Sequence, residues 1–234
     1  MKRELSIYLK FNKLMNILGI DTSTNNCSVG IVINGKLVGR NAQIGRSMAS
    51  EQLISLIDDL LKQSIPMSEI DAIAVSIGPG SYTGLRIGLS TAKGLAFARR
   101  LPVLPVPTMV VLESVARQTI DSDMVLMIKS HRDLAYHVYC QKENPLHIDS
   151  IDIGYDSFFD IRQRYQNQYL YISPSEISDP DFNVVETLFP EGDHVALLAH
   201  QHYQVLRSQS VPGLEPLYLS EFEVKKWKPK TESG

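Results

Sequence analysis

Cysteine, excess positive charge and long apolar runs are all scarce in this sequence. Cys27 and Cys140 are the two cysteines among 234 residues, and neither belongs to a CxxC pair. This excludes a disulfide framework and a zinc ribbon, and it fits a reducing compartment. The chain has 23 Lys and Arg residues against 26 Asp and Glu residues, a formal net charge of -3. Because the chain has no overall positive charge to hold a phosphate backbone, we expect that any role on RNA involves contact through a partner protein.

The chain also lacks the signals of membrane insertion or export. No run approaches the roughly 18 to 20 apolar residues that cross a bilayer. The N-terminal segment MKRELSIYLKFNKL carries charges where a signal peptide needs an apolar region. We therefore expect a cytoplasmic protein with no membrane role.

The residues that are present favour a folded chain of two parts. Its composition is 44% hydrophobic and 21% charged, close to that of globular domains. The length suits one large domain or two lobes of about 100 residues each. We expect a poorly ordered N-terminal extension at 1–14, lobes at 15–110 and 111–220, and a basic C-terminal tail at 221–234 that contains four lysines.

The first half alternates short β-branched runs with amphipathic segments. Asn34-Gly35 separates two of these runs and predicts a two-residue hairpin. Apolar residues at spacings of three and four predict a helix over 48–63. The expected order is three strands, helix, strand, helix, strand and helix, over 17–22, 28–33, 36–42, 48–63, 70–77, 85–100, 101–106 and 109–118.

The second half repeats this pattern in weaker form. Strands are expected at 125–129, 134–141 and 148–154, followed by helices near 157–165 and 195–206 that flank a strand at 168–173. Such a duplication resembles the actin-like (ASKHA, ribonuclease-H-like) ATPase fold. We therefore predict an α/β protein with two lobes, each a mixed sheet flanked by helices.

Two loops of the first lobe are candidates for binding a phosphate. One follows the first strand, and the other is the glycine-rich turn GPGSYTG, which opens a helix whose N-terminus favours an anion. The turn lacks the lysine of a P-loop and is not a dinucleotide fingerprint. The alternative is that the first loop only bonds its own backbone, as Asx and ST turns do. The candidate residues are Asp21, Thr22, Ser23, Gly78, Gly80, Ser81 and Gly84.

These residues also carry a family resemblance. LGIDTSTNNCSVGIV, followed by AVSIGPGSYTGLRIGLSTAKGLA and LPVLPVPTM, is similar to the TsaB family, formerly YeaZ, over about residues 16–115. PLYL at 216–219 is similar to the PxYxR ending of many members, with Ser220 in place of Arg. The resemblance implies a glycoprotease-like protein that supports the TsaD enzyme in making threonylcarbamoyladenosine next to the tRNA anticodon.

TsaD itself carries an HxxxH metal motif that this chain lacks. Thr108 and Leu112 stand where the two histidines would be, and all six histidines lie at or after residue 131. His200 and His202 are close in sequence, but their spacing points the rings apart on a helix. The resemblance therefore implies no catalytic residue and no metal ligand, which disfavours the alternative of an M22-like metallopeptidase.

An actin-like ATPase also needs a second turn that contains an aspartate, at the start of the second lobe, and a pair of glycines that approaches the adenosine. The start of the second lobe, Ile128-Lys129-Ser130-His131, offers no aspartate, and Glu191-Gly192-Asp193 has one glycine where a pair is needed. We therefore expect no cofactor, with ATP and magnesium bound only in complex with partners, and regard the two loops as vestigial. A standalone actin-like ATPase or kinase stays as the alternative.

The resemblance further implies a heterodimer with a TsaD-like enzyme, a homodimer in isolation, a TsaE-like ATPase in a larger complex, and only indirect contact with tRNA. In the family, helices of the N-terminal lobes pack into an intermolecular bundle. The alternative for the same apolar stripe is ordinary core. Charge reversal by Leu60→Glu is predicted to abolish association without unfolding. The expected interface residues are Leu53, Leu56, Ile57, Leu60, Arg86, Leu89, Ser90, Lys93 and Phe97.

Overall fold

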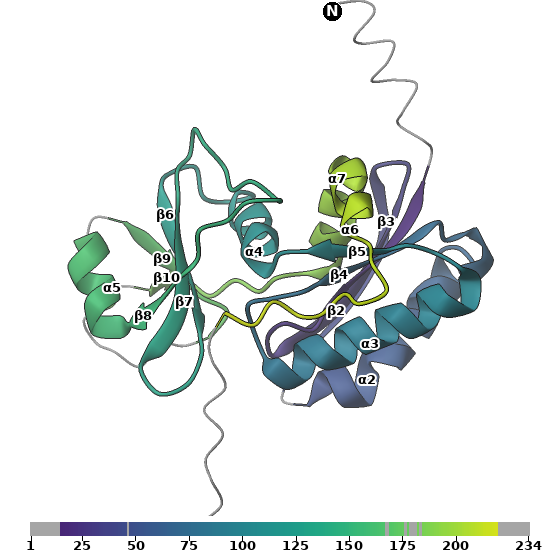
Figure 1. The fold of residues 1–234 in the computed structure, drawn as a ribbon, viewed down its shortest axis with the longest axis horizontal. Helices are drawn as coiled ribbons and strands as arrows, with labels where there is room; N and C mark the ends of the chain where they lie inside the picture. Colours follow the sequence, from purple (N-terminus) through teal and green to yellow (C-terminus); the bar gives the residue numbers. More distant parts are fainter. Residues whose placement is uncertain are drawn as a thin grey trace, which may run out of the picture.

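A computed structural model describes residues 15–45, 47–166, 169–175, 177, 182 and 184–219. The predicted extension at 1–14 and the basic tail at 221–234 lie outside these residues. The described chain forms two lobes that lie side by side (Figure 1). None of the described helices is long and apolar enough to span a bilayer.

The first lobe is built on a five-stranded sheet in the order β3-β2-β1-β4-β5. Neighbours among the first three strands are antiparallel, and β1, β4 and β5 run parallel. Helices α2 and α3 cover one face of this sheet (Figure 1). A 3-10 turn, η1 (Met67–Glu69), leads into β4. The bounds are β1 (Asn16–Asp21), β2 (Asn26–Ile33), β3 (Lys36–Ile44), α2 (Met48–Gln63), β4 (Ala72–Ser76), α3 (Tyr82–Arg99) and β5 (Val103–Val106).

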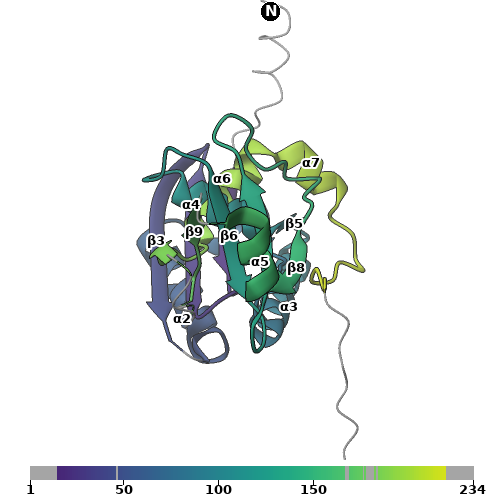
Figure 2. The ribbon, with the colours of Figure 1, turned by 90° about the vertical axis from the view of Figure 1, so that its left-hand side faces the viewer.

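The second lobe repeats the same strand order. Its sheet runs β10-β9-β6-β7-β8, with β6, β7 and β8 antiparallel and β6, β9 and β10 parallel. Helix α5 (Phe158–Tyr165) covers the face turned away from the first lobe (Figure 2). The predicted duplication and fold class are thus confirmed. The bounds are β6 (Met124–Lys129), β7 (Leu134–Cys140), β8 (Gly154–Ser157), β9 (Leu170–Ile172) and β10 (Val184–Glu186).

The strand predicted at 148–154 is wrong. Residues 148–153 form an irregular segment, with one isolated bridge between His147 and Ser150, and β8 begins only at Gly154. Ile148 is buried in the core of the first lobe, and Ile151 packs against the cores of both lobes. Apolar residues that suggested a strand therefore anchor a loop between the lobes.

Helix α4 (Thr108–Ala116) lies between the two lobes and is buried on nearly all sides. Met109 and Leu112 belong to the core of the second lobe, whereas Val110 and Val111 belong to the core of the first. The helix therefore fixes one sheet against the other.

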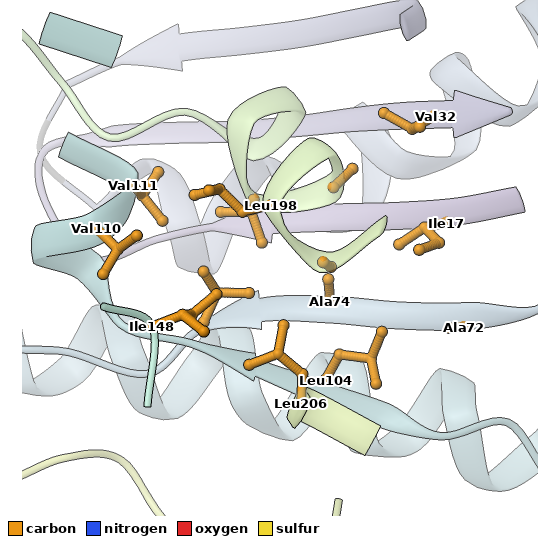
Figure 3. Close-up of a cluster of buried hydrophobic side chains, with 14 of the residues drawn as sticks. Ile17, Val32, Ala72, Ala74, Leu104, Val110, Val111, Ile148, Leu198 and Leu206 are labelled. Carbon is orange, nitrogen blue, oxygen red and sulfur yellow. The ribbon is translucent and has the colours of Figure 1, made fainter. Parts of the chain in front are cut away.

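Helices α6 (Gly192–Gln201) and α7 (Tyr203–Ser208) return to the first lobe, although the predicted boundary assigns 111–220 to the second. Leu198 of α6 and Leu206 of α7 lie over Ile17, Ala74 and Leu104 of the first sheet (Figure 3). This sheet face is apolar and α2 and α3 lie on the opposite face, so the last helices of the described chain complete the first core. The second lobe is accordingly an insertion within the first.

Candidate functional site

Asp21 ends β1 as a fully buried carboxylate. It accepts hydrogen bonds from the backbone N–H of Ser23 at 3.0 Å and from the hydroxyls of Ser23 and Ser76. Burial raises the pKa of Asp21 to about 6, against the opposing effect of these hydrogen bonds. Within the described part of the chain no Lys or Arg forms an ion pair with it. The charge is therefore held by hydroxyl and amide dipoles alone.

Thr22 joins the first loop to α3. Its hydroxyl donates to the carbonyl oxygen of Gly84 at 2.8 Å. A Cβ added at Gly84 would lie 2.0 Å from the Thr22 carbonyl oxygen, and one added at Gly88 would lie 2.2 Å from the Thr22 Oγ1. These two glycines thus permit direct contact between loop and helix, whereas a Cβ at Gly94, in the same helix, would have nothing within 4 Å.

The glycine-rich turn packs onto the same loop. The backbone N–H of Ser81 donates to the Ser23 carbonyl oxygen at 2.7 Å, and a Cβ at Gly80 would lie 2.3 Å from that oxygen. Ser81 caps α3 by accepting from the Gly84 N–H at 3.2 Å. The two loops are therefore closed against each other.

A cleft of about 1520 Å³ opens between the lobes next to these loops. All seven predicted loop residues come together beside it, but only Ser23, Gly80 and Ser81 line it. Asp21 and Thr22 are wholly buried behind that surface. The carboxylate expected to face a phosphate is thus set back from the cleft.

The opposite wall of the cleft was not predicted as a site. It is formed by the turn between β6 and β7, where Lys129, His131 and Arg132 line the cleft with Ser130. The sequence showed this turn only as a place without the aspartate of an ATPase. The signal that could have identified this wall is its local composition, because three of the four residues at 129–132 are basic.

Thr108 is the residue that the family resemblance places where the HxxxH motif has its first histidine. It is fully buried, and its hydroxyl accepts a hydrogen bond from the Gly78 backbone N–H at 3.1 Å. Leu112 is equally buried, in the core of the second lobe. Both positions therefore serve packing and loop attachment.

Glu191, Asp193 and His194 gather at the start of α6, with one potential ligand atom of each within 4.8 Å of the others. The Arg40 guanidinium lies 2.8 Å from Glu191 and 3.5 Å from Asp193. Both ring nitrogens of His194 are hydrogen-bonded, to Ser114 and to Gln118, each at 2.8 Å. Burial and then the Asp193 charge raise the pKa of Glu191. Arg40 already holds the place that a cation would take, so this cluster is a structural ion pair.

The C-terminal segment crosses the first lobe and clamps α3. The backbone N–H of Leu217 donates to the Ile77 carbonyl oxygen at 2.7 Å, and Lys93 donates to the Leu214 carbonyl oxygen. Arg86 donates to the Tyr218 hydroxyl at 2.8 Å and lies 3.8 Å above the Tyr82 ring. Arg86 and Lys93, expected at a partner interface, thus bind this chain's own C-terminal segment.

The remaining predicted interface residues divide between core and surface. Leu53, Ile57, Leu60 and Leu89 are buried in the core of the first lobe, so their side chains are not on its surface, and Leu56 is partly buried against the same core. Ser90 and Phe97 are exposed, and the Phe97 side chain is 87% exposed. On the same pair of helices, Ile54 is 62% exposed.

Comparison with known proteins gives a family match. The family model described as TsaD, tRNA N6-adenosine threonylcarbamoyltransferase, matches residues 45–176, more than half of the chain. The tRNA threonylcarbamoyladenosine biosynthesis protein TsaB of Haemophilus influenzae is 34% identical over 103 residues, which are 44% of this chain and 43% of that protein. The TsaB protein of Escherichia coli is 26% identical over 219 residues, 88% of this chain and 94% of that protein.

The chain thus matches less than half the length of the first relative and nearly all of the second. Among solved structures, YeaZ from Pseudomonas aeruginosa superposes with a TM-score of 0.69 at 23% identity, covering 88% of this chain and 100% of that one. This likeness shows a shared fold.

Proposed function

Because the chain belongs to the TsaB (YeaZ) family within the TsaD-like superfamily, we propose that it acts in tRNA threonylcarbamoyladenosine biosynthesis as a noncatalytic partner of a TsaD-type enzyme. The partner would transfer the threonylcarbamoyl group, and a TsaE-like ATPase would join the larger cytoplasmic complex. In the absence of the enzyme, the surface of this chain that binds the enzyme would instead form a homodimer.

The observation that carries the noncatalytic role is the use made of Thr108 and Leu112. Neither side chain can supply an imidazole, and both are committed to packing inside the chain. The described lining of the cleft includes no carboxylate that could hold magnesium for a nucleotide. These features favour a noncatalytic subunit over the alternatives of a metallopeptidase or a standalone ATPase.

The exposed side of α2 and α3 is the surface that we propose for the partner. Ile54 and Phe97 leave large apolar side chains in solvent on these two helices, although the adjoining apolar residues are buried. A large apolar side chain that becomes buried at the centre of an interface can act as a hot spot, and truncating a hot spot costs about 2 kcal/mol of binding free energy, roughly 30-fold in Kd.

The test is co-purification with the TsaD-type enzyme of the same organism. The double variant Ile54→Glu, Phe97→Glu is expected to lose the enzyme while keeping the circular dichroism spectrum and melting temperature of the parent. Phe159→Glu, which alters an aromatic on α5 that is 59% exposed, close to the 62% of Ile54, is the matched control and should keep the enzyme. Leu60→Glu is unsuitable because Leu60 is in the core, where a carboxylate would unfold the lobe.

Retention of the enzyme by the folded double variant would rule out this surface. The wider function has its own readout, which is the threonylcarbamoyladenosine content of tRNA after depletion of the chain. Unchanged modification after depletion would contradict the proposed function.

A further inference from the structure

We propose that the cleft between the lobes binds a single-stranded segment of RNA directly. This site goes beyond the supporting role proposed above, which needs no contact between this chain and RNA. It also differs from the expectation, drawn from the net charge of -3, that RNA would be contacted only through a partner.

The first argument is the local charge of the cleft. Arg86 lies on the wall formed by α3, and Lys129 and Arg132 lie on the facing wall formed by the turn after β6. The cleft lining contains no Asp or Glu among the described residues; Glu215 acts on Arg86 but is not part of the lining. Lys129 and Arg132 form no ion pair with any described residue, so their charges are available to phosphates.

The second argument is the pairing of tyrosines with these charges. Tyr82 and Tyr218 lie on the first wall with ring centroids 5.3 Å apart, and Tyr136 and Tyr155 lie on the second with centroids 4.7 Å apart. Tyr136 is buried and Arg86 lies 3.8 Å above the Tyr82 ring, so Tyr218 and the half-buried Tyr155 are the rings that a base can reach. Bases stack on aromatic side chains beside a positively charged groove in proteins that bind single strands. Each wall of the cleft thus supplies one accessible tyrosine ring, Tyr218 or Tyr155, together with basic side chains.

The third argument is size and chemistry together. A cleft of about 1520 Å³ exceeds the roughly 300 to 1,000 Å³ typical of small-molecule sites. A magnesium-bound nucleoside triphosphate needs an oxygen ligand for the metal, and the buried Asp21 does not reach the lining. A short RNA strand needs only cations for its phosphates and flat surfaces for its bases, which is what the lining offers.

The first experiment measures fluorescence anisotropy of a labelled single-stranded RNA of roughly 12 nucleotides, within the range of known single-strand sites, with the full chain. The double variant Lys129→Gln, Arg132→Gln is expected to weaken binding at least about tenfold and to flatten the slope of log affinity against log salt by about 1.4. The control Lys36→Gln, Arg207→Gln removes the same charge outside the cleft and should bind as the parent does.

Three results would overturn the site: no binding by the parent chain at low salt, equal weakening by both double variants, or competition by ATP with magnesium as strong as that by unlabelled RNA. Equal weakening would mean that only the overall charge matters. Co-purification of the enzyme from nuclease-treated extract tests the supporting role separately, so each idea can fail alone.

The second experiment needs no variant. A 4-thiouridine-containing RNA is crosslinked to the parent chain, and the crosslinked peptides are identified by mass spectrometry. We expect crosslinks in peptides that contain Tyr155 or Tyr218. Crosslinks confined to residues 220–234, which hold Lys225, Lys226, Lys228 and Lys230, would assign binding to the tail and overturn the proposal.

Discussion

At the scale of single residues, the end of β1 shows how the loop predicted to face a phosphate is bonded within the chain. Thr22 bonds the first turn of α3, and Asp21 is enclosed by the hydroxyls of Ser23 and Ser76. The sequence left two hypotheses open for these residues, a ligand loop and a self-bonded turn. Asp21 makes the contact of an Asx turn, because its carboxylate accepts from the Ser23 N–H, whereas Thr22 donates to the Gly84 carbonyl oxygen of α3. Both side chains are used inside the chain.

A buried carboxylate without a cation lowers stability at neutral pH. The pKa of Asp21 is raised from 3.8 to about 6, so its proton is bound more tightly in the folded state than in the unfolded one. This contribution is full below pH 3.8 and is lost as the pH rises through about 6. Asp21→Asn removes the titration, and we expect the variant to gain up to about 3 kcal/mol over the parent between pH 4 and pH 8, at about 1.4 kcal/mol per pKa unit.

Urea unfolding of both proteins at pH 4, 6 and 8 measures this gain. Asp59→Asn, at an exposed position on α2, controls for the loss of one negative charge. A difference between Asp21→Asn and the parent that stays constant across this pH range would contradict the assigned role of burial.

At the scale of elements, α3 has three separate duties along its length. Its first turns contact the loop after β1, its buried side covers the first sheet, and its exposed side holds Arg86 and Lys93 against the C-terminal segment. Small residues on one side make the first duty sterically possible.

Two glycines of α3 give a matched pair of substitutions. Gly88→Ala puts a methyl group 2.2 Å from the Thr22 hydroxyl oxygen, and the resulting overpacking is expected to cost about 1 to 3 kcal/mol of unfolding free energy. Gly94→Ala meets nothing within 4 Å and should gain about 0.5 to 1 kcal/mol from helix propensity. Thermal and urea unfolding measure both, and equal stability of the two variants would disprove the close approach of Thr22.

The bounds of the helices and strands could largely be predicted from the sequence, whereas the neighbours against which each element packs could not. Helix α2 has the predicted bounds, because an apolar stripe of helical period depends on local sequence alone. Whether Leu53, Ile57 and Leu60 face their own sheet or a partner depends on what lies opposite, which the period does not record. The same limit explains the segment at 148–153, where the buried Ile148 and the partly buried Ile151 anchor a loop.

At the scale of the whole molecule, the two lobes share α4, and the sequence of the second lobe is inserted within that of the first. The first sheet is covered on one face by α2 and α3 and on the other by α6 and α7, which follow the second lobe in sequence (Figure 1). The site has the same character, since one wall of the cleft belongs to each lobe. The basic wall could not be predicted beside the tyrosines because their proximity arises only from the packing of the lobes.

This arrangement predicts that the first lobe does not fold alone. A fragment of residues 1–122 leaves Ile17, Val32, Ala74 and Leu104 without the cover of α6 and α7. At about 1.5 to 3 kcal/mol for each large side chain, the loss is comparable with the entire net stability of about 5 to 15 kcal/mol. We expect poor dispersion of its amide NMR signals and no cooperative melting.

The control replaces residues 123–187 by a flexible Gly-Ser linker and keeps both halves of the first lobe. This chain should regain cooperative melting, because α6 and α7 can again reach the sheet. A cooperative transition in the 1–122 fragment equal to that of the full chain would contradict the interlaced core.

Because α6 and α7 are synthesised last but pack on the first lobe, they also determine which lobe can fold first on the ribosome. The ten strands of the described residues are synthesised before residue 192, yet the second face of the first sheet is covered only after Leu198 and Leu206 have been added. The second sheet has its final strand by residue 186 and is free to close first. The second lobe, although its synthesis begins later, is therefore the first that can be completed. Premature termination after residue 186 would release a chain in which one face of the first sheet leaves its apolar side chains in solvent.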